Sequence, residues 1–295
     1  MQTDEIQIIT GQNASQNASF EPNDKTIDYE TSKNLSYSDI ISLYKGLNVI
    51  SEFYDVAGAA TATPTGICAV SLGKSLEESV TNVMDSNPID FMQSTILLTK
   101  EVDSDLAKML KETHIVAAPS FTKNAIEYFD THDVCYVTIK TSLKDYKKYL
   151  SNEVTITPLG TLTQTPNLSE LDKDSFKVVT KLKPTVEQIE DAVFAWKVAK
   201  HVSSRAIVIA KDLKTTAISQ GLQSASIEYA LDYSCDRSKE AILASDTNIS
   251  LHDLNVAAQG RISLAILPAA SKEIVENADK LNISIITTGF TNILY

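Results

Sequence analysis

Histidines with polar or acidic neighbours are the side chains of this sequence best suited to acid–base chemistry. Two of its four histidines, His201 and His252, stand in settings compatible with a functional site. His201 falls between an expected helix and an expected strand, a junction that can line a site in an α/β domain. His252 is followed by Asp253, whose carboxylate would orient a neighbouring imidazole. Both histidines are also typical of connecting or solvated positions, so both interpretations stay open.

Motifs for phosphate, acyl-transfer and metal chemistry are absent. There is no glycine-rich phosphate loop, no G-x-S-x-G elbow and no H-E-x-x-H. The zinc deaminase signature, H-x-E followed by P-C-x-x-C, is also missing. The three cysteines, Cys68, Cys135 and Cys235, are far apart and odd in number, which argues against a disulfide framework or a zinc knuckle. The sequence therefore predicts no metal site.

Composition excludes two further classes of protein. The chain has 295 residues, 43% hydrophobic and 22% charged, which is ordinary for a globular protein. The formal net charge is −12, so the basic surface that nucleic-acid binding requires is not expected. No apolar run reaches the roughly 20 residues that span a bilayer, and the first ten residues lack the features of a signal peptide. We therefore expect a cytoplasmic protein with no nucleic-acid or membrane partner.

Helix and strand signals alternate along the chain and predict an α/β fold in two halves of similar style. Thr185 and Gln188 form a capping box, and an apolar helical face follows over 185–200. The apolar run 206–210 then predicts a buried strand. A second capping box, at Ser75, predicts another helix start. The other expected helices are 35–53, 105–112, 124–129 and 272–280, and the other expected strands are 57–62, 67–70, 96–98, 115–118, 134–139, 263–267 and 283–287.

Short motifs along the whole chain occur in the order typical of one enzyme family. They are "IITGQNASQ" (8–16), "KNLSYSDII" (33–41), "PTG" (64–66), "EVDSDLAKML" (101–110), "VAAPSFTKNAIEYF" (116–129), "LGTLTQ" (159–164), the stretch 183–212, "ASDTNISLHD" (244–253), "AAQGRISLAILPAAS" (257–271) and "IITTGFTNILY" (285–295). Together they resemble the formyltransferase domain of the bifunctional purine enzyme aminoimidazole carboxamide ribotide (AICAR) formyltransferase/IMP cyclohydrolase. The resemblance starts where that domain starts and leaves the cyclohydrolase domain absent.

The resemblance implies an α/β fold of two cytidine-deaminase-like subdomains, each a mixed sheet covered by helices. We expect an N-terminal subdomain at 1–156, a linker at 157–184 and a C-terminal subdomain at 185–295, because residues 157–176 are rich in turn formers. The family also implies a homodimer with substrate sites formed between subunits. Formyl-tetrahydrofolate is the implied formyl donor if the chain is active, and no other cofactor is expected.

The residues that carry the family's chemistry are replaced. Formyl transfer to an aromatic amine needs a proton acceptor and stabilisation of an oxyanion. The family's Lys-His pair ahead of the P-x-G turn falls on Ala60 and Thr61, which can neither accept a proton at neutral pH nor carry positive charge. Ala225 stands where the family has a phosphate-directed arginine, and Ile9 stands in another such position. No catalytic residue of the family is thus retained.

Other family positions leave candidates for binding. Asn13, Phe91, Asp246 and Asp253 match the family, and Asp253 matches a binding position. Arg205 replaces a family asparagine and would supply a cation. These five residues are the substrate-binding candidates, although most of them also suit a role in turns and scaffold.

Two hypotheses follow, because the family's structural motifs are present and its reactive residues are replaced. The first is a catalytically degenerate homologue that acts as a binding or assembly protein, as a homodimer or as a heterodimer with an active relative. The alternative is an active formyltransferase-like enzyme of purine or related nucleotide metabolism that uses a formyl-folate donor and a different substrate. In the alternative, His201 and His252 are the candidates for replacement acid or base.

Overall fold

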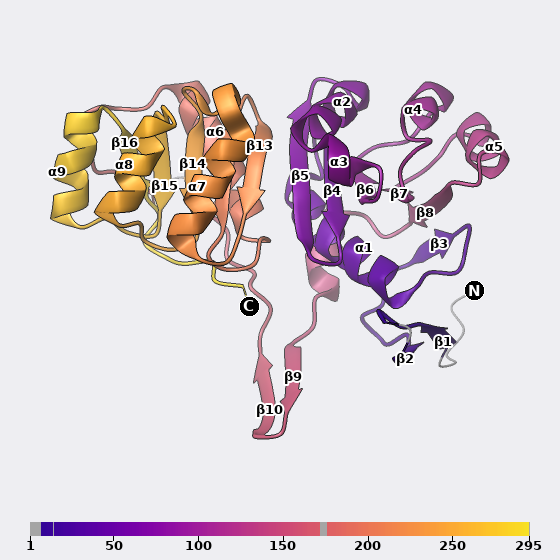
Figure 1. The fold of residues 1–295 in the computed structure, drawn as a ribbon. Helices are drawn as coiled ribbons and strands as arrows, with labels where there is room; N and C mark the ends of the chain where they lie inside the picture. Colours follow the sequence, from indigo (N-terminus) through magenta and orange to yellow (C-terminus); the bar gives the residue numbers. More distant parts are fainter. Residues whose placement is uncertain (1–6, 14, 172–175, 295) are drawn as a thin grey trace.

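The computed structural model describes residues 7–13, 15–171 and 176–294, which fold into two halves standing side by side (Figure 1). The predicted fold class, an α/β protein with mixed sheets covered by helices, is confirmed. Among the described residues, no helix combines the length and apolarity needed to cross a membrane.

The N-terminal half contains a mixed sheet with the strand order β5-β4-β6-β7-β8-β3. Parallel pairs join β6 to β7 and β7 to β8, and the remaining neighbours are antiparallel. Its strands are β3 (Tyr29–Thr31), β4 (Ala57–Thr63), β5 (Gly66–Gly73), β6 (Thr95–Leu98), β7 (Ile115–Ala118) and β8 (Cys135–Ile139). Its helices are α1 (Tyr37–Ile50), η1 (Ser51–Phe53), α2 (Leu76–Ser86), α3 (Pro88–Phe91), α4 (Ser104–Met109), α5 (Lys123–Thr131) and η2 (Tyr146–Tyr149).

The C-terminal half repeats this topology, with the strand order β13-β12-β14-β15-β16-β11 and parallel pairs at the corresponding places. Its strands are β11 (Lys177–Val178), β12 (Ile207–Lys211), β13 (Lys214–Ser219), β14 (Ile242–Ser245), β15 (Leu264–Leu267) and β16 (Ser284–Thr287). Its helices are α6 (Val186–Ala199), α7 (Gln223–Ser234), η3 (Cys235–Ser238), α8 (Leu251–Gln259) and α9 (Lys272–Leu281). The two halves expected from the alternating helix and strand signals therefore have the same order and connectivity of strands.

Side-chain alternation in the strands divides the apolar core into layers. In β12, Ile207 and Ile209 pack toward α7, α8 and α9, whereas Val208 and Ala210 pack toward α6 on the opposite face. A separate cluster lies beneath α2, α4 and α5 of the N-terminal half. The cluster beneath α1 and α6 contains residues of both halves, so this face of the sheet shares one continuous core. The two halves are thus packed together through apolar contact.

Strands β5 and β13 join the two sheets at the centre of the molecule. Their ladder contains a single residue pair, Ser71 with Lys214. The Leu72 N–H donates to the Leu213 carbonyl at 2.9 Å, and the Thr215 hydroxyl bonds both backbone groups of Val70 at 3.0 and 3.2 Å. The short ladder leaves room for cavities between the halves on either side of the sheet.

Helix α1 lies close to the sheet because of one glycine. Its N-terminus is fixed by a capping box in which the Ser36 and Asp39 side chains bond each other's backbone N–H. A Cβ atom at Gly46 would come within 1.9 Å of a Leu97 methyl carbon in β6. The absence of that atom allows α1 to pack on the strand and places the end of the helix beside α6.

Two hairpins project from the layered core. The β1 (Gln7–Thr10) and β2 (Asn17–Phe20) strands form one, and the β9 (Glu153–Thr157) and β10 (Gly160–Gln164) strands form the other. In Figure 1 the β9–β10 hairpin extends downward from the body of the molecule, between the two halves. It occupies part of the segment expected as the linker 157–184, of which residues 172–175 lie outside the described residues. The proposed domain limits at 156 and 185 remain a prediction.

Several elements of the C-terminal half were not predicted from sequence. They are β11, β13, α7, β14 and α8. Leu222 precedes helix α7 at the N-cap position and provides no side-chain cap, so the helix has no local start signal. Helix α8 does carry one, because Ser250 and Asp253 form a capping box. That S-x-x-D spacing would have identified the helix.

Candidate functional site

A groove with a volume of about 800 Å³ separates the two halves beside α3 and α7. Its floor is the β4–β5 turn, in which Pro64 and Thr65 connect the strands and Pro64 fixes the turn geometry. The segment 218–226 approaches from the other half, and the Gln220 side-chain amide donates to the Thr65 carbonyl at 3.4 Å. The groove thus brings together two segments about 155 residues apart. The first is the P-x-G turn, and the second contains Ala225, which stands where the family has an arginine.

Neutral polar and aromatic groups dominate the lining of the groove. The Tyr233 hydroxyl donates to Asn87 Oδ1 at 3.1 Å, and the Tyr229 and Tyr233 rings stack with centroids 6.1 Å apart. The Asp90 carboxylate accepts from the Asn87 side-chain amide at 2.7 Å. No lysine, arginine or histidine occurs among the described residues that line the groove. Such a surface suits uncharged rings and hydrogen-bonding groups better than a phosphate.

Cys68 also lines the groove, but it is not set up as a nucleophile. Its thiol lies within 3.9 Å of the Thr63 hydroxyl and 3.8 Å of the Gly66 carbonyl. Burial raises the pKa of Cys68 to about 11. The reactive form of cysteine is the thiolate, so this side chain is an unreactive thiol at neutral pH. It is half-buried, Cys135 is buried and Cys235 is exposed.

The positions of the missing Lys-His pair lie inside β4. Ala60 is fully buried and Thr61 is 1% exposed, and neither lines the groove. The Thr61 hydroxyl lies 3.5 Å from the Ala69 carbonyl of the neighbouring strand. Ala225, where the family has an arginine, does line the groove.

Three binding candidates are scaffold residues in this structure. Phe91 is 3% exposed and belongs to the core beneath α2, α4 and α5. Asp246 is fully buried and accepts from the Ser204 hydroxyl at 2.9 Å and the Ala206 N–H at 2.8 Å; burial raises its pKa. Asp253 caps α8. None of the three lines the groove.

Asp253 does not orient His252 as the sequence suggested. One Asp253 oxygen accepts from the Ser250 N–H at 2.8 Å and the other from the Ser224 hydroxyl at 2.9 Å. His252 is exposed and lies 3.4 Å from the Glu228 carboxylate. The pairing expected from adjacent residues is not formed, because successive residues of a helix point in different directions.

Asn13 and Arg205 are exposed residues outside the groove. The Asn13 side-chain amide donates to Gln16 Oε1 at 2.6 Å in the β1–β2 turn. Arg205 directly precedes Ala206 and β12. The five binding candidates are therefore spread over the chain rather than gathered in one pocket.

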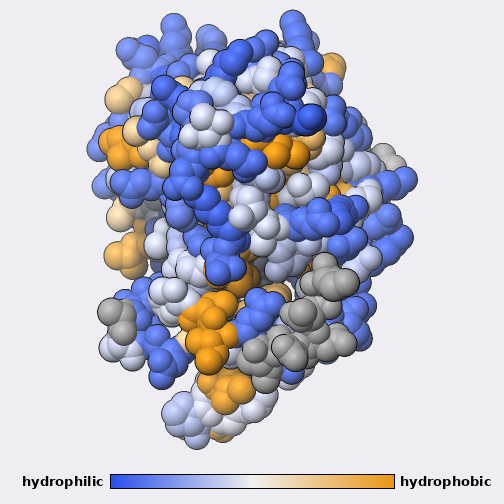
Figure 2. Space-filling model, turned by 90° about the vertical axis from the view of Figure 1, so that its right-hand side faces the viewer, coloured by the Kyte–Doolittle hydropathy of each residue, from blue (hydrophilic) through white to orange (hydrophobic). Residues whose placement is uncertain are grey.

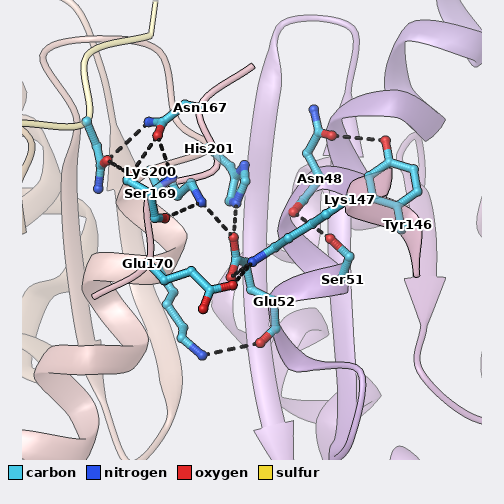
Figure 3. Close-up of polar contacts among 12 residues, drawn as sticks. Asn48, Ser51, Glu52, Tyr146, Lys147, Asn167, Ser169, Glu170, Lys200 and His201 are labelled. Atoms are coloured by element: carbon cyan, nitrogen blue, oxygen red, sulfur yellow. Dashed lines mark hydrogen bonds and ion pairs between the residues drawn. The ribbon is translucent and has the colours of Figure 1, made fainter. Parts of the chain in front are cut away.

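His201 belongs to a buried ion-pair network centred on Glu52, a residue that the sequence analysis missed (Figure 3). Glu52 Oε1 accepts from Lys200 Nζ at 3.0 Å and from His201 Nε2 at 3.1 Å, and Oε2 lies 3.1 Å from Lys147 Nζ. Lys147 also pairs with Glu170 at 2.9 Å. A glutamate between the apolar residues Ile50 and Phe53 was the only local signal for it, since carboxylates are rarely buried without partners.

The charges of this network determine the protonation states of Glu52 and His201. Burial alone would raise the pKa of Glu52, but the His201 hydrogen bond and the nearby ammonium groups of Lys200 and Lys147 hold it well below its usual range. Burial lowers the pKa of His201. At neutral pH the histidine is uncharged, and its Nε2–H donates to the ionised carboxylate. His201 thus donates to a carboxylate that belongs to the other half.

No metal-ligating cluster is found in the part of the chain that the structure describes, where a cluster means three or more histidine, cysteine, aspartate or glutamate side chains.

Comparisons with known proteins place these features in a family context. Residues 2–232 match a family model described as AICARFT/IMPCHase bienzyme. Curated relatives, each called bifunctional purine biosynthesis protein PurH, are 30% identical over 267 residues in Anoxybacillus flavithermus, 32% over 265 residues in Caldicellulosiruptor saccharolyticus and 32% over 267 residues in Fusobacterium nucleatum. These alignments cover 86–87% of this chain but 51% of each relative. The chain therefore spans about half the length of the curated relatives it matches.

Proposed function

Because the chain belongs to the AICARFT/IMPCHase bienzyme family of purine biosynthesis, we propose that it is a catalytically degenerate member that binds or assembles rather than transfers a formyl group. The observation that carries the proposal is the chemistry of the groove. The family's P-x-G turn and the segment that ends at Ala225 meet there, yet no cationic side chain is among the described residues of its lining. The Lys45 ammonium group is not part of this lining, and it donates to the Thr65 carbonyl of the turn at 3.3 Å. A ribotide phosphate would therefore find no charged donor among the described lining residues.

Loss of the proton-handling pair supports the same proposal. Ala60 and Thr61 lie buried in β4, and neither side chain can accept a proton from an attacking amine at neutral pH. A general base typically contributes about 10²–10⁴ to the rate of a reaction, and the absence of phosphate contacts would add poor positioning to that loss. His201 is hydrogen-bonded to Glu52 and is not among the residues that line the groove, so it does not supply a base there.

The alternative is an active enzyme with a formyl-folate donor and a different substrate. The stacked Tyr229 and Tyr233 rings, with the amides of Asn87 and Gln220, favour an uncharged aromatic ligand in the groove. His252, which is exposed, and Arg205 would be the first residues to test for new duties. Binding of a neutral ring without turnover would be equally compatible with the degenerate protein.

Assembly with a second subunit is the other part of the proposal. The β9–β10 hairpin carries exposed apolar side chains: Val154 at 58%, Ile156 at 83%, Leu159 at 100% and Leu162 at 65%. An isolated two-stranded hairpin is marginally stable in water, so a partner surface would stabilise it. Figure 2 shows hydrophobic residues at the lower end of the face seen there. We propose a homodimer, or a heterodimer with an active relative, in which this hairpin is covered.

A formyl-transfer assay tests the catalytic part. With formyl-tetrahydrofolate and AICAR as substrates, the purified chain should give no detectable formyl transfer under conditions in which a bifunctional relative is active. Thermal unfolding with AICAR, folates and neutral purines then tests binding, since a ligand at about 100 times its Kd stabilises by ~2.7 kcal/mol. Robust turnover of AICAR by the unmodified chain would overturn the proposal.

Sedimentation velocity tests the assembly part. We expect a dimer at micromolar concentration, with a total buried area above roughly 2,000 Å². Ile156→Asp in the hairpin should shift the equilibrium toward monomer, whereas Ile89→Asp, at a position 78% exposed in α3, serves as the matched control. A monomeric unmodified chain at that concentration would contradict this part while leaving the catalytic part untouched.

A further inference from the structure

A second cavity, here called the lysine cavity, lies between the halves on the α1 and α6 side of the sheet. Its volume is about 350 Å³, at the small end of the range for ligand pockets. Elements of both halves and of the connecting segment contribute to it. Its lining comprises residues of η1, the region of η2, residues 169–171, α6 and Asn292 near the C-terminus.

Lysines distinguish this cavity from the rest of an acidic protein. Four of them line it, Lys144, Lys147, Lys197 and Lys200, against two carboxylates, Glu52 and Glu170. The lining therefore carries a charge excess of two positive units (4 − 2), in a chain whose formal net charge is −12. Local positive charge within an acidic surface attracts anions.

Two of the lysines are not neutralised by the internal ion pairs. Lys147 and Lys200 pair with Glu52 and Glu170, as described above. Among the described residues, Lys197 Nζ donates only to the Glu52 carbonyl, at 3.4 Å, and it lies 5.5 Å from the centre of the Phe53 ring. Lys144 is exposed and makes no hydrogen bond or ion pair with any residue that the structure describes. Both ammonium groups have donors left for a ligand.

The wall of the cavity contains the buried Trp196 ring. Trp196 lines the cavity and is 2% exposed, and its indole N–H has no hydrogen-bond partner among the described residues. The nitrogen itself has almost no accessible surface, so the ring is a spectroscopic probe of the cavity but does not supply a donor to a bound molecule.

We propose that the lysine cavity binds a small phosphate-bearing anion, held by the ammonium groups of Lys144 and Lys197. Lysine is a common phosphate ligand because it acts as a compact point charge with several donors. Lys144 comes from the N-terminal half and Lys197 from the C-terminal half, so a bound anion would connect the two halves. The site is separate from the groove and does not depend on the function proposed for it.

Intrinsic fluorescence gives a direct test, because Trp196 is the only tryptophan of the chain. Titration with inorganic phosphate should change the emission with saturation at one site per chain. Potassium chloride at matched ionic strength should not reproduce the change. A parallel titration with glycerol 3-phosphate distinguishes free phosphate from a phosphate monoester, according to which probe binds more tightly. If neither probe gives a saturable change beyond the chloride control, the proposal is wrong.

Variants locate the site. Lys144→Gln and Lys197→Met should each weaken the apparent Kd by about tenfold, since each removes one charge-assisted contact. Lys272→Gln, at an α9 side chain 90% exposed and outside the cavity, is the matched control. Lys144 is exposed, so its variant should fold, and circular dichroism will check this. Unchanged affinity in both cavity variants would place the anion elsewhere and overturn the assignment.

Discussion

The groove and the lysine cavity both lie between the two halves, yet they differ in how their polar groups are held. In the groove, Ala225 and Asp90 lie at exposed positions, and no cationic side chain is found in the described lining. In the lysine cavity, Glu52 and Lys200 have side chains 5% and 6% exposed and are bonded to each other. A substitution that changes charge should therefore cost little stability in the groove and much more in the lysine cavity.

This difference indicates at which positions a substitution can occur without loss of stability. A buried carboxylate deprived of its cation leaves an uncompensated charge, which destabilises the fold. A side chain at the rim of an open groove faces water, and its replacement costs little stability. In this chain the buried Glu52 network is present, and no cationic side chain lies in the described lining of the groove. This combination is compatible with the proposed loss of catalysis.

The largest expected effect is the removal of the central carboxylate. Glu52→Gln leaves Lys200 buried without a counter-charge and should lower the free energy of unfolding by about 3–5 kcal/mol. Glu170→Gln is the matched control, because that side chain is 75% exposed, and it should cost no more than about 1 kcal/mol. Urea denaturation measures both. Similar losses in the two variants would remove the distinction between the buried and exposed partners.

Lowering the pH should weaken the same network. The pKa of Glu52 is lowered in the folded state, so its contribution is present above its unfolded value of about 4.5 and is lost as the pH falls toward the folded value. The free energy of unfolding should therefore decline below about pH 5, and less steeply in Glu52→Gln than in the unmodified chain. Parallel pH profiles of the two proteins would show that Glu52 is not the group responsible.

A smaller effect is expected in the groove. Tyr233→Phe removes the hydroxyl that donates to Asn87 and should cost about 0.5–1.5 kcal/mol, the usual worth of one hydrogen bond. Tyr229→Phe is the control, since the described residues offer its hydroxyl no acceptor and the residue is 58% exposed. Denaturant unfolding compares the two. A loss of more than 3 kcal/mol for Tyr233→Phe would show that the groove tolerates substitution no better than the lysine cavity.

The smallest effect on stability should come from restoring a cation to the groove. Ala225→Arg, at an exposed position, should change the free energy of unfolding by no more than about 0.5 kcal/mol. It should nevertheless raise affinity for a ribotide phosphate by about tenfold, as one charge-assisted contact would. Calorimetric titration of the variant and the unmodified chain measures the change. A strongly destabilised variant would show that the groove does not tolerate charge.

Local signals predicted several of the elements that possess them, although α8 was missed despite its capping box. Helix α6 has a capping box and an apolar face, and the structure begins it at Val186, directly after the predicted cap Thr185. Strand β12 has a continuous apolar run because both of its faces are covered. Helix α7 has no side-chain cap, and the sequence analysis missed it.

The candidate sites show more clearly what cannot be predicted from the sequence. The sequence identified Ala60, Thr61 and Ala225 as replaced positions, but not that Ala60 and Thr61 are buried in a strand while Ala225 lies at the groove. His201 was noted as a candidate acid or base. Its glutamate partner lies 149 positions away, and no local pattern indicates that contact.

The sequence by itself determined which residue types are available for chemistry and the periodicities that build helices and strands, because both depend on neighbours within a few positions. The tertiary structure alone decided which side chains meet between the halves. Glu52, Lys147 and Lys200 come from separate elements, and their contact depends on how the two sheets pack at β5 and β13. Burial and the distances between charges are properties of that packing, and they bring the His201 ring to the Glu52 carboxylate.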